Sequence, residues 1–201
     1  MNIYVEANFV LELALLQEQH ASCEDILRLC EAGSAGLFLP AYSLVEPYET
    51  LVRRHWRRRQ MKRELEQELG QLRRTALYTQ RLGELLTLTS LLIDSVNDET
   101  KRLEDTRSRL LSLAHVIPLD ISVLAAAARY QIERGLSPQD AVVYAAVLSH
   151  LRQSGAPESC FLNKNSKDFD DPGLVEELNT YHCRLIPQFD DGYHFILSRL
   201  A

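Results

Sequence analysis

Short segments of continuous apolar character, separated by helical patterns, constrain the fold of this chain more than any other feature of its sequence. Five such segments predict strands, at Ile3–Val5, Leu37–Leu39, Val116–Leu119, Cys160–Leu162 and Arg184–Ile186. Strands without polar alternation are buried on both faces, as in a parallel sheet covered by helices. Helical patterns lie between them, at Phe9–Gln19, Cys23–Glu31, Leu44 onward, Ser122–Arg134 and Pro138–Arg152. Alternation of strands and helices predicts an α/β fold with a central parallel sheet.

One long segment, from about Val52 to about Ser112, interrupts this alternation because it has helix formers and spaced leucines but no strand pattern. We interpret residues 53–113 as an all-helical insertion, much longer than an ordinary connection. It is expected to form two or three long helices with a turn near Val96-Asn97-Asp98. The length of 201 residues suits a single domain, residues 1–201, that carries this insertion.

The composition excludes several classes of protein. Hydrophobic residues at 46% and charged residues at 25% indicate an ordinary globular core. A net charge of -6 argues against nucleic-acid binding through overall charge, although it leaves room for a local basic patch. The longest uncharged apolar runs, such as Leu85–Ile93, are about half the length of a membrane span, and the N-terminus lacks a basic leader. The four cysteines show no metal-ligand spacing and are expected to be reduced thiols.

Acidic residues occur where strands end and helices begin. Glu6 follows the first strand, Glu46 follows the second, Asp140 opens a helix, and Asp168 follows the strand Cys160–Leu162. Ligands of open parallel sheets bind at the carboxyl ends of the strands, so the four carboxylates are expected at one edge of the sheet. Oxygen ligands from separate elements suit Mg²⁺ or Mn²⁺, which would relieve the repulsion between the acids. Such an ion can activate water against a phosphodiester.

Each acid taken singly also has a structural interpretation. Ser43-x-x-Glu46 has the pattern of a capping box, and Ser137-Pro138-x-Asp140 has the same signature with proline at its favoured position. Asp168 could favour the start of the next helix. Glu6 is the exception, because no helix-start pattern requires an acid directly after the first strand. The joint placement of the four acids therefore supports the metal site more than any one of them.

These motifs resemble those of the PIN domain family. Ile3-Tyr4-Val5-Glu6-Ala7-Asn8 is similar to the family's opening strand, acid and Asn or Thr, and Ser43-Leu44-Val45-Glu46 to its second acid. Leu136-Ser137-Pro138-Gln139-Asp140-Ala141 is similar to the third acidic motif. Phe161-Leu162-Asn163-Lys164-Asn165 with Lys167-Asp168-Phe169 is similar to the fourth. The resemblance covers about residues 1–50 and 114–190 and leaves the helical segment outside.

The resemblance implies a three-layer PIN-like α/β fold and a Mg²⁺ or Mn²⁺-dependent endoribonuclease. The implied metal and catalytic residues are Glu6, Glu46, Asp140 and Asp168, with supporting roles for Asn8, Asn163 and Asn165. It also implies a cytoplasmic protein, a toxin held by an antitoxin, with RNA as its substrate. The family usually has Asp where this chain has Glu6, and this departure favours the alternative of a catalytically weak PIN-like module that binds RNA or a protein partner. Part of the helical segment could form a homodimer or receive a partner helix.

A basic stretch at the start of the helical segment is the candidate RNA-binding surface. Its proposed contacts are Arg53, Arg54, Trp56, Arg57 and Arg58, with Trp56 able to stack on an unpaired base. Two alternatives remain open for this stretch. It could be a solvated helix whose cations pair with the acids of 64–68, or it could dock an acidic partner segment.

Overall fold

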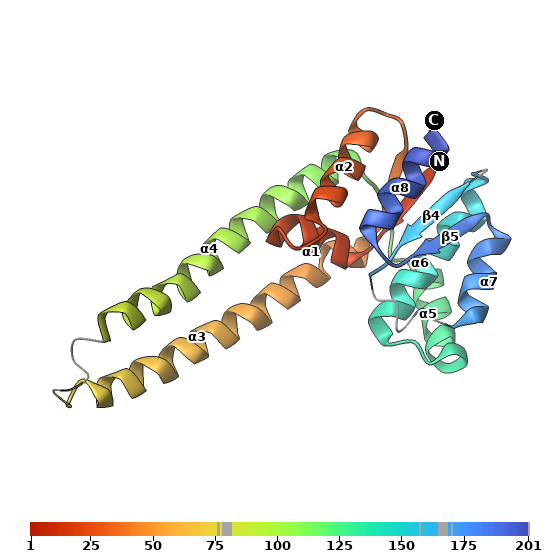
Figure 1. Cartoon of the computed structure of the whole chain (residues 1–201). Coiled ribbons are helices and arrows are strands. Elements are labelled where there is room, and N and C mark those ends of the chain that lie inside the picture. The colour runs from red at the N-terminus through yellow and green to blue at the C-terminus, as the bar shows by residue number, and fades with distance from the viewer. Residues whose placement is uncertain (76, 78–81, 157, 165–168, 170, 201) are drawn as a thin grey trace.

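A parallel sheet with helices on both faces forms the body of the molecule (Figure 1). The computed structural model describes the whole chain except residues 76, 78–81, 157, 165–168, 170 and 201, and the side chains of 82–89. In the described part the sheet has five strands in the order β3-β2-β1-β4-β5. Their bounds are β1 Asn2–Val5, β2 Gly36–Pro40, β3 His115–Ile117, β4 Ser159–Leu162 and β5 Cys183–Ile186. All four pairings are parallel, which confirms the predicted α/β class.

Side chains of the central strand β1 alternate between two hydrophobic cores. Ile3 and Val5 belong to the core under α1 Ala7–Leu15, α2 His20–Glu31 and α8 Phe189–Leu200. Tyr4 belongs to the core under three other helices, which are α5 Ile121–Arg134, α6 Pro138–Ser154 and α7 Pro172–Thr180. Burial on both faces explains why the inner strands β1 and β4 are almost continuously apolar. The result is the three-layer arrangement expected from the resemblance. Helices α7 and α8 had no counterpart in the sequence prediction.

Two long helices, α3 Glu46–Leu72 and α4 Leu82–Leu113, form a hairpin whose far end projects away from the sheet (Figure 1). The predicted turn near Val96-Asn97-Asp98 was wrong, because α4 is continuous there. The Asn-Asp pair is typical of a turn, but Val96 lies only 3% exposed. Leu103 and Leu110 are also buried and follow at intervals of seven residues, so a single apolar stripe continues through the expected break.

A buried ion pair joins the two helices of the hairpin. The Arg58 guanidinium donates to both oxygens of Glu99, at 2.8 and 2.9 Å, and to Ser95 Oγ at 3.0 Å. His55 Nε2 lies 3.5 Å from the same carboxylate. Arg58 was expected to contact RNA, but its guanidinium is directed into the hairpin and fixes the register of α3 against α4. Removing Arg58 would leave the buried Glu99 carboxylate without its main partner, which is destabilising.

The second half of α4 belongs to the body of the domain. Leu103 and Leu110 lie in the same core as β1, and Arg102 Nε donates to the carbonyl oxygen of Ala14 at 2.9 Å. Arg109 bridges to Glu24 and Glu31 on α2, at 2.7 Å in each case. The helical segment is therefore continuous with the layer that covers one face of the sheet, and only its far part is a projecting arm.

Two further expectations concern the environment of the chain. Within the described residues, no helix combines the length and apolar character that a membrane-spanning segment needs. Cys23, Cys30, Cys160 and Cys183 are buried free thiols, as predicted. Burial raises the pKa of the Cys30 and Cys183 thiols to about 12 in each case, so they behave as small apolar side chains.

Neighbouring leucines on α4 test whether this helix is part of the core. Leu110 is fully buried, whereas Leu111 is 53% exposed. We expect Leu110→Ala to lower the free energy of unfolding by about 2–5 kcal/mol, because it leaves a cavity. Leu111→Ala should change it by less than about 0.5 kcal/mol. Urea denaturation measures both, and equal effects would show that α4 is not an integral part of the core.

Candidate functional site

Glu6 lies at the carboxyl end of β1 and begins α1. Its side chain is the N-cap of that helix, with Oε2 accepting the backbone N–H of Asn8 at 2.8 Å. The sequence analysis found no helix start that needed this acid, so the structure adds a capping role that the sequence pattern did not show. Only 6% of the residue is exposed, and Oε1 is buried without a hydrogen-bond partner among the described residues. One oxygen of Glu6 is thus committed to the fold and the other is not.

The environment of Glu6 strongly favours its protonated form. Burial raises the pKa of this carboxyl from 4.5 to about 8, and the negative charge of Glu46 adds to the shift. The hydrogen bond from the Asn8 backbone and the nearby backbone amide of Lys164 oppose the shift without cancelling it. A buried carboxylate that still lacks a partner for one oxygen is a group that a bound cation would stabilise.

Glu46, the first residue of α3, lies within electrostatic range of two other predicted ligands. Burial raises its pKa, and the charges of Asp140 and Glu49 raise it further, whereas Arg53 lowers it. The charge of Glu46 also raises the pKa of Glu6, so Glu46 interacts electrostatically with both Glu6, at the start of α1, and Asp140, on α6. Helices of different layers therefore bring Glu6, Glu46 and Asp140 towards the same edge of the sheet.

The two predicted capping boxes have different outcomes. Ser137 caps α6 by accepting the backbone N–H of Asp140 at 3.2 Å, and it donates its hydroxyl to Asp140 Oδ2 at 2.5 Å. Ser43 does not cap α3, because it lies in the 3-10 helix η1 Ala41–Leu44 and Val45 takes the N-cap position. The Glu46 carboxylate is consequently not part of a capping box, which removes the structural alternative considered for it.

The described residues on either side of the fourth acid are packed against the body of the domain. Asn163 is buried after β4 and donates its backbone N–H to Ile186 at 3.1 Å, while the Lys164 ammonium pairs with the fully buried Glu12 of α1. At the other end, Phe169 is buried and its ring lies edge-on to Phe161 at 5.8 Å. The predicted ligand Asp168 and the supporting Asn165 lie outside the described residues.

Tyr42 is an additional candidate for the site that the sequence did not indicate. Burial raises the pKa of its hydroxyl, followed in effect by the charges of Glu46, Glu49 and Asp140, with Arg53 opposing. The phenol therefore lies among the candidate carboxylates, where it can donate a hydrogen bond to a carboxylate or to a ligand. The sequence feature that could have indicated Tyr42 is its position in the connection between the second strand and Glu46.

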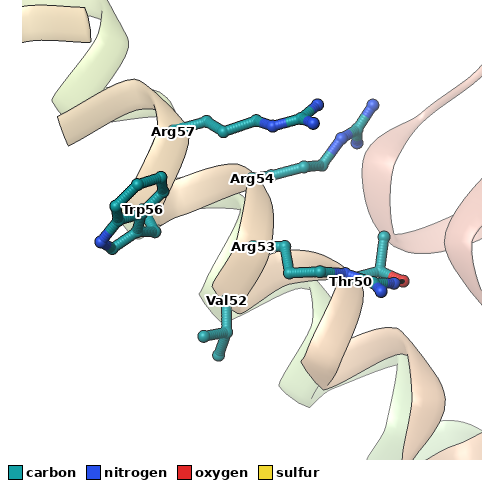
Figure 2. Close-up of a pocket in the computed structure, with 6 residues that line it drawn as sticks. All are labelled: Thr50, Val52, Arg53, Arg54, Trp56 and Arg57. Atoms are coloured by element: carbon teal, nitrogen blue, oxygen red, sulfur yellow. Dashed lines mark hydrogen bonds between the residues drawn. The ribbon is translucent and has the colours of Figure 1, made fainter. Parts of the chain in front are cut away.

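A basic face on α3 begins beside these acids. Figure 2 shows Arg54 and Arg57 extending to the same side of the helix, with Trp56 and Val52 directed elsewhere. Together with Thr50 and Arg53, these residues line a surface hollow of about 670 Å³. Arg53 lies between the basic face and the acids. Its guanidinium donates to Thr50 Oγ1 at 3.3 Å, and its positive charge lowers the pKa of Glu46. The basic face is thus continuous with the acidic edge of the sheet.

Comparison with models of known protein families identifies the family of this chain. A family model described as PIN domain matches residues 3–169. The chain belongs to the PIN domain family. PIN domains are generally nucleases that use divalent metals. The match includes the helical segment, which the motif comparison had placed outside, and it ends at Phe169. The comparison with curated proteins gave no match.

The raised pKa of Glu6 predicts how stability depends on pH in metal-free buffer. The folded state keeps a proton on Glu6 up to about pH 8, whereas the unfolded chain loses it near pH 4.5. The folded state therefore binds more protons between these values, and stability should fall as pH rises, by at most about 1.4 kcal/mol per pH unit. In Glu6→Gln this contribution disappears, so the fall should be shallower.

Denaturant titration in EDTA across this pH range measures the two slopes. Comparing slopes removes the constant cost of the weaker cap that glutamine makes. Glu133→Gln, which changes an exposed acid on α5, is the control and should follow the wild type. Parallel curves for Glu6→Gln and wild type would show that Glu6 is ionised normally in the folded protein.

Proposed function

We propose that this PIN domain is a metal-dependent endoribonuclease in which Glu6, Glu46, Asp140 and Asp168 hold Mg²⁺ or Mn²⁺. The observation that carries the proposal is that Glu46 lies within electrostatic range of both Glu6 and Asp140, which come from segments far apart in the sequence. Membership of the family supports nuclease chemistry in general. The metal, the RNA substrate and the residue roles are the proposal.

The donor set suits a hard divalent cation. All the proposed ligands are carboxylates, and Glu6 Oε1 is a buried oxygen without a described hydrogen-bond partner. Among the described residues, no three His, Cys, Asp or Glu side chains are grouped closely enough to hold an ion. Binding therefore requires Glu46 and Asp140 to turn towards Glu6. Both residues lie in the first turn of their helices and are partly exposed, so they have room to do so.

Such an ion, when bound, supplies Lewis-acid stabilisation and lowers the pKa of a bound water. The protein's own contribution is positioning. Asn8 orients Glu6, Ser137 orients Asp140, and Asn163 closes the end of β4 beside the segment that carries Asn165 and Asp168. Arg53, on the same helix as Glu46, is placed to hold a phosphate next to the one attacked.

A catalytically weak module that binds RNA or protein is the second candidate. Glu6 favours it, because one of its oxygens already caps α1 and its pKa is raised to about 8, which makes the ionised ligand costly. The two candidates differ in whether the acids contribute to turnover or only to binding, and the activity assay below distinguishes them.

The resemblance also suggests a cellular role. We propose a cytoplasmic toxin whose acidic edge is blocked by an antitoxin. Two copies of this chain could also associate, and a homodimer is the simplest such assembly. A neighbouring gene for a small DNA-binding protein, and co-purification of its product with this chain, would support this role. Isolation of the chain in active form from cells that contain no such partner would contradict it.

Asp140→Asn tests the chemistry. The substitution removes a charge but keeps the shape of the side chain, and Ser137 still caps α6. We expect cleavage of single-stranded RNA in Mg²⁺ or Mn²⁺ to fall by about a hundredfold or more, with little change in melting temperature. Glu133→Gln is the matched control and should cleave as the wild type does. Equal cleavage by Asp140→Asn and wild type would assign the activity to other residues or to a contaminant.

Divalent ions should stabilise the folded protein directly. An ion present at a hundred times its dissociation constant adds about 2.7 kcal/mol, which raises the melting temperature of a chain of this size by roughly 5–10 °C. The increase should be lost in Asp140→Asn, because a ligand charge is missing. Thermal denaturation with MnCl₂, MgCl₂ or EDTA measures it. An equal increase in wild type and Asp140→Asn would place the ion elsewhere.

A further inference from the structure

The most unusual exposed side chain on the arm is Trp56, the only tryptophan of the protein. It is 63% exposed on α3, and Val52, one turn earlier, is 65% exposed. A large aromatic ring held in solvent by a regular helix contributes little to folding. Exposed aromatic groups next to arginines are typical of surfaces that stack on unpaired bases.

Trp56 separates two hollows on the surface of the arm. The first is the hollow of about 670 Å³ between Thr50 and Arg57 (Figure 2). The second, of about 470 Å³, lies further along α3 and reaches across to α4. It is lined by Trp56, Arg59, Lys62, Arg63, Glu66 and Ile93. Because both hollows include Trp56 and several cations, we call the surface from Thr50 to Lys62 along α3 the basic track.

The cations of this track differ in what they already bind. Arg58 is committed to Glu99 inside the hairpin, and Lys62 lies 3.6 Å from Glu66. Arg53 and Arg57 form no ion pair with any carboxylate in the described part of the chain. Both are exposed and flank Trp56 on the helix. Arg59 also forms no such ion pair, but Arg53 and Arg57 share the first hollow with Trp56 and lie nearer to Glu46, so these two guanidinium groups are the best placed to receive phosphates.

We propose that the face of α3 formed by Arg53, Trp56 and Arg57 binds an unpaired stretch of the RNA substrate beyond the cleaved bond. This proposal rests on the proposed function. A base stacks on the Trp56 indole, and the two arginines hold the flanking phosphates. At 1.5 Å per residue, Arg53 lies about 10 Å and Trp56 about 15 Å along the helix from Glu46, so the same strand can reach both the acids and the track.

The pattern of side chains favours RNA over a partner helix. A docked helix needs an apolar stripe at intervals of three and four residues. On α3 the stripe that begins with Val52 and Trp56 continues with Arg59 and Arg63, so it ends after two residues. Duplex RNA is also unsuited, because its bases are already stacked and paired. An unpaired strand matches both the flat indole and the spaced cations.

The single tryptophan makes the contact directly measurable. Short labelled oligoadenylate is titrated in EDTA against the full-length protein carrying Asp140→Asn, so that no cleavage occurs. We expect quenching of Trp56 fluorescence in step with the anisotropy of the labelled RNA. In this background, Trp56→Ala should weaken binding about tenfold or more, whereas Trp56→Phe, which keeps a ring, should stay within about threefold.

The arginines are tested by their dependence on salt. Arg53→Gln with Arg57→Gln should reduce the slope of log affinity against log salt by about 1.4, which corresponds to two lost phosphate contacts on a single strand. Arg129→Gln, on an exposed residue of α5, is the control and should leave the slope unchanged. A merely structural role of the arginines would lower affinity without changing this slope.

The outcomes separate this proposal from the nuclease. Quenching by RNA in EDTA, without cleavage by wild type in Mg²⁺ or Mn²⁺, would support the track and overturn the nuclease. Cleavage by wild type together with unchanged binding by the Trp56→Ala and the arginine variants would overturn the track alone. Equal binding of duplex RNA, or binding of polyglutamate in place of RNA, would also overturn it, and the second result would indicate an acidic protein partner.

Discussion

Glu6, Glu46 and Asp140 lie towards one edge of one sheet, and the fold holds Glu6 and Glu46 there against the cost of burying a carboxylate. The cost is largest at Glu6, which is buried at the end of β1 and whose pKa is raised to about 8. Strand β1 is paired on both sides, with β2 and β4, so its end cannot move away from the neighbouring segments. The position of the acid is therefore set by the core strand before it and by the helix cap that its Oε2 makes. A group kept in an unfavourable place by a rigid scaffold is typical of functional sites.

Two buried ion pairs support this arrangement from different sides. Lys164 binds the buried Glu12, and thereby fastens the segment after β4 to α1, the helix that Glu6 caps. Arg58 binds Glu99 and fixes α3, the helix that begins with Glu46, against α4. In both cases a long cationic side chain satisfies a carboxylate that is almost inaccessible to water. These pairs specify the relative positions of elements more than they add net stability, because burial of the charges offsets much of their attraction.

The sequence predicted the elements whose signal is local. The apolar strands and the Ser137 cap follow from neighbouring residues, and the structure confirms both. The sequence prediction was wrong where the structure depends on a contact with a residue far away in the sequence. The turn expected at Val96-Asn97-Asp98 is absent because Val96 packs inside the hairpin. Arg58 turns inward because it pairs with Glu99, a partner forty-one residues away in the sequence. Tyr42 escaped notice for the same reason, since only the folded chain brings it among the acids. The position of the acids after the ends of parallel strands predicted that they would lie near one edge of the sheet. It did not predict that one carboxylate oxygen of Glu6 caps α1.

Helix α3 connects the two halves of the proposed site. Its first residue is Glu46, at the edge of the sheet, and Arg53, Trp56 and Arg57 follow within the next three turns. Because the Arg58–Glu99 pair holds this part of α3 against α4, the distance from the acids to the indole is set by helix geometry and does not depend on a flexible loop. A strand held at Trp56 would therefore present a bond at a fixed distance along the chain. If the proposed site binds RNA, the helical segment of this protein, whose net charge is -6, keeps positive charge next to acids that would otherwise repel the substrate.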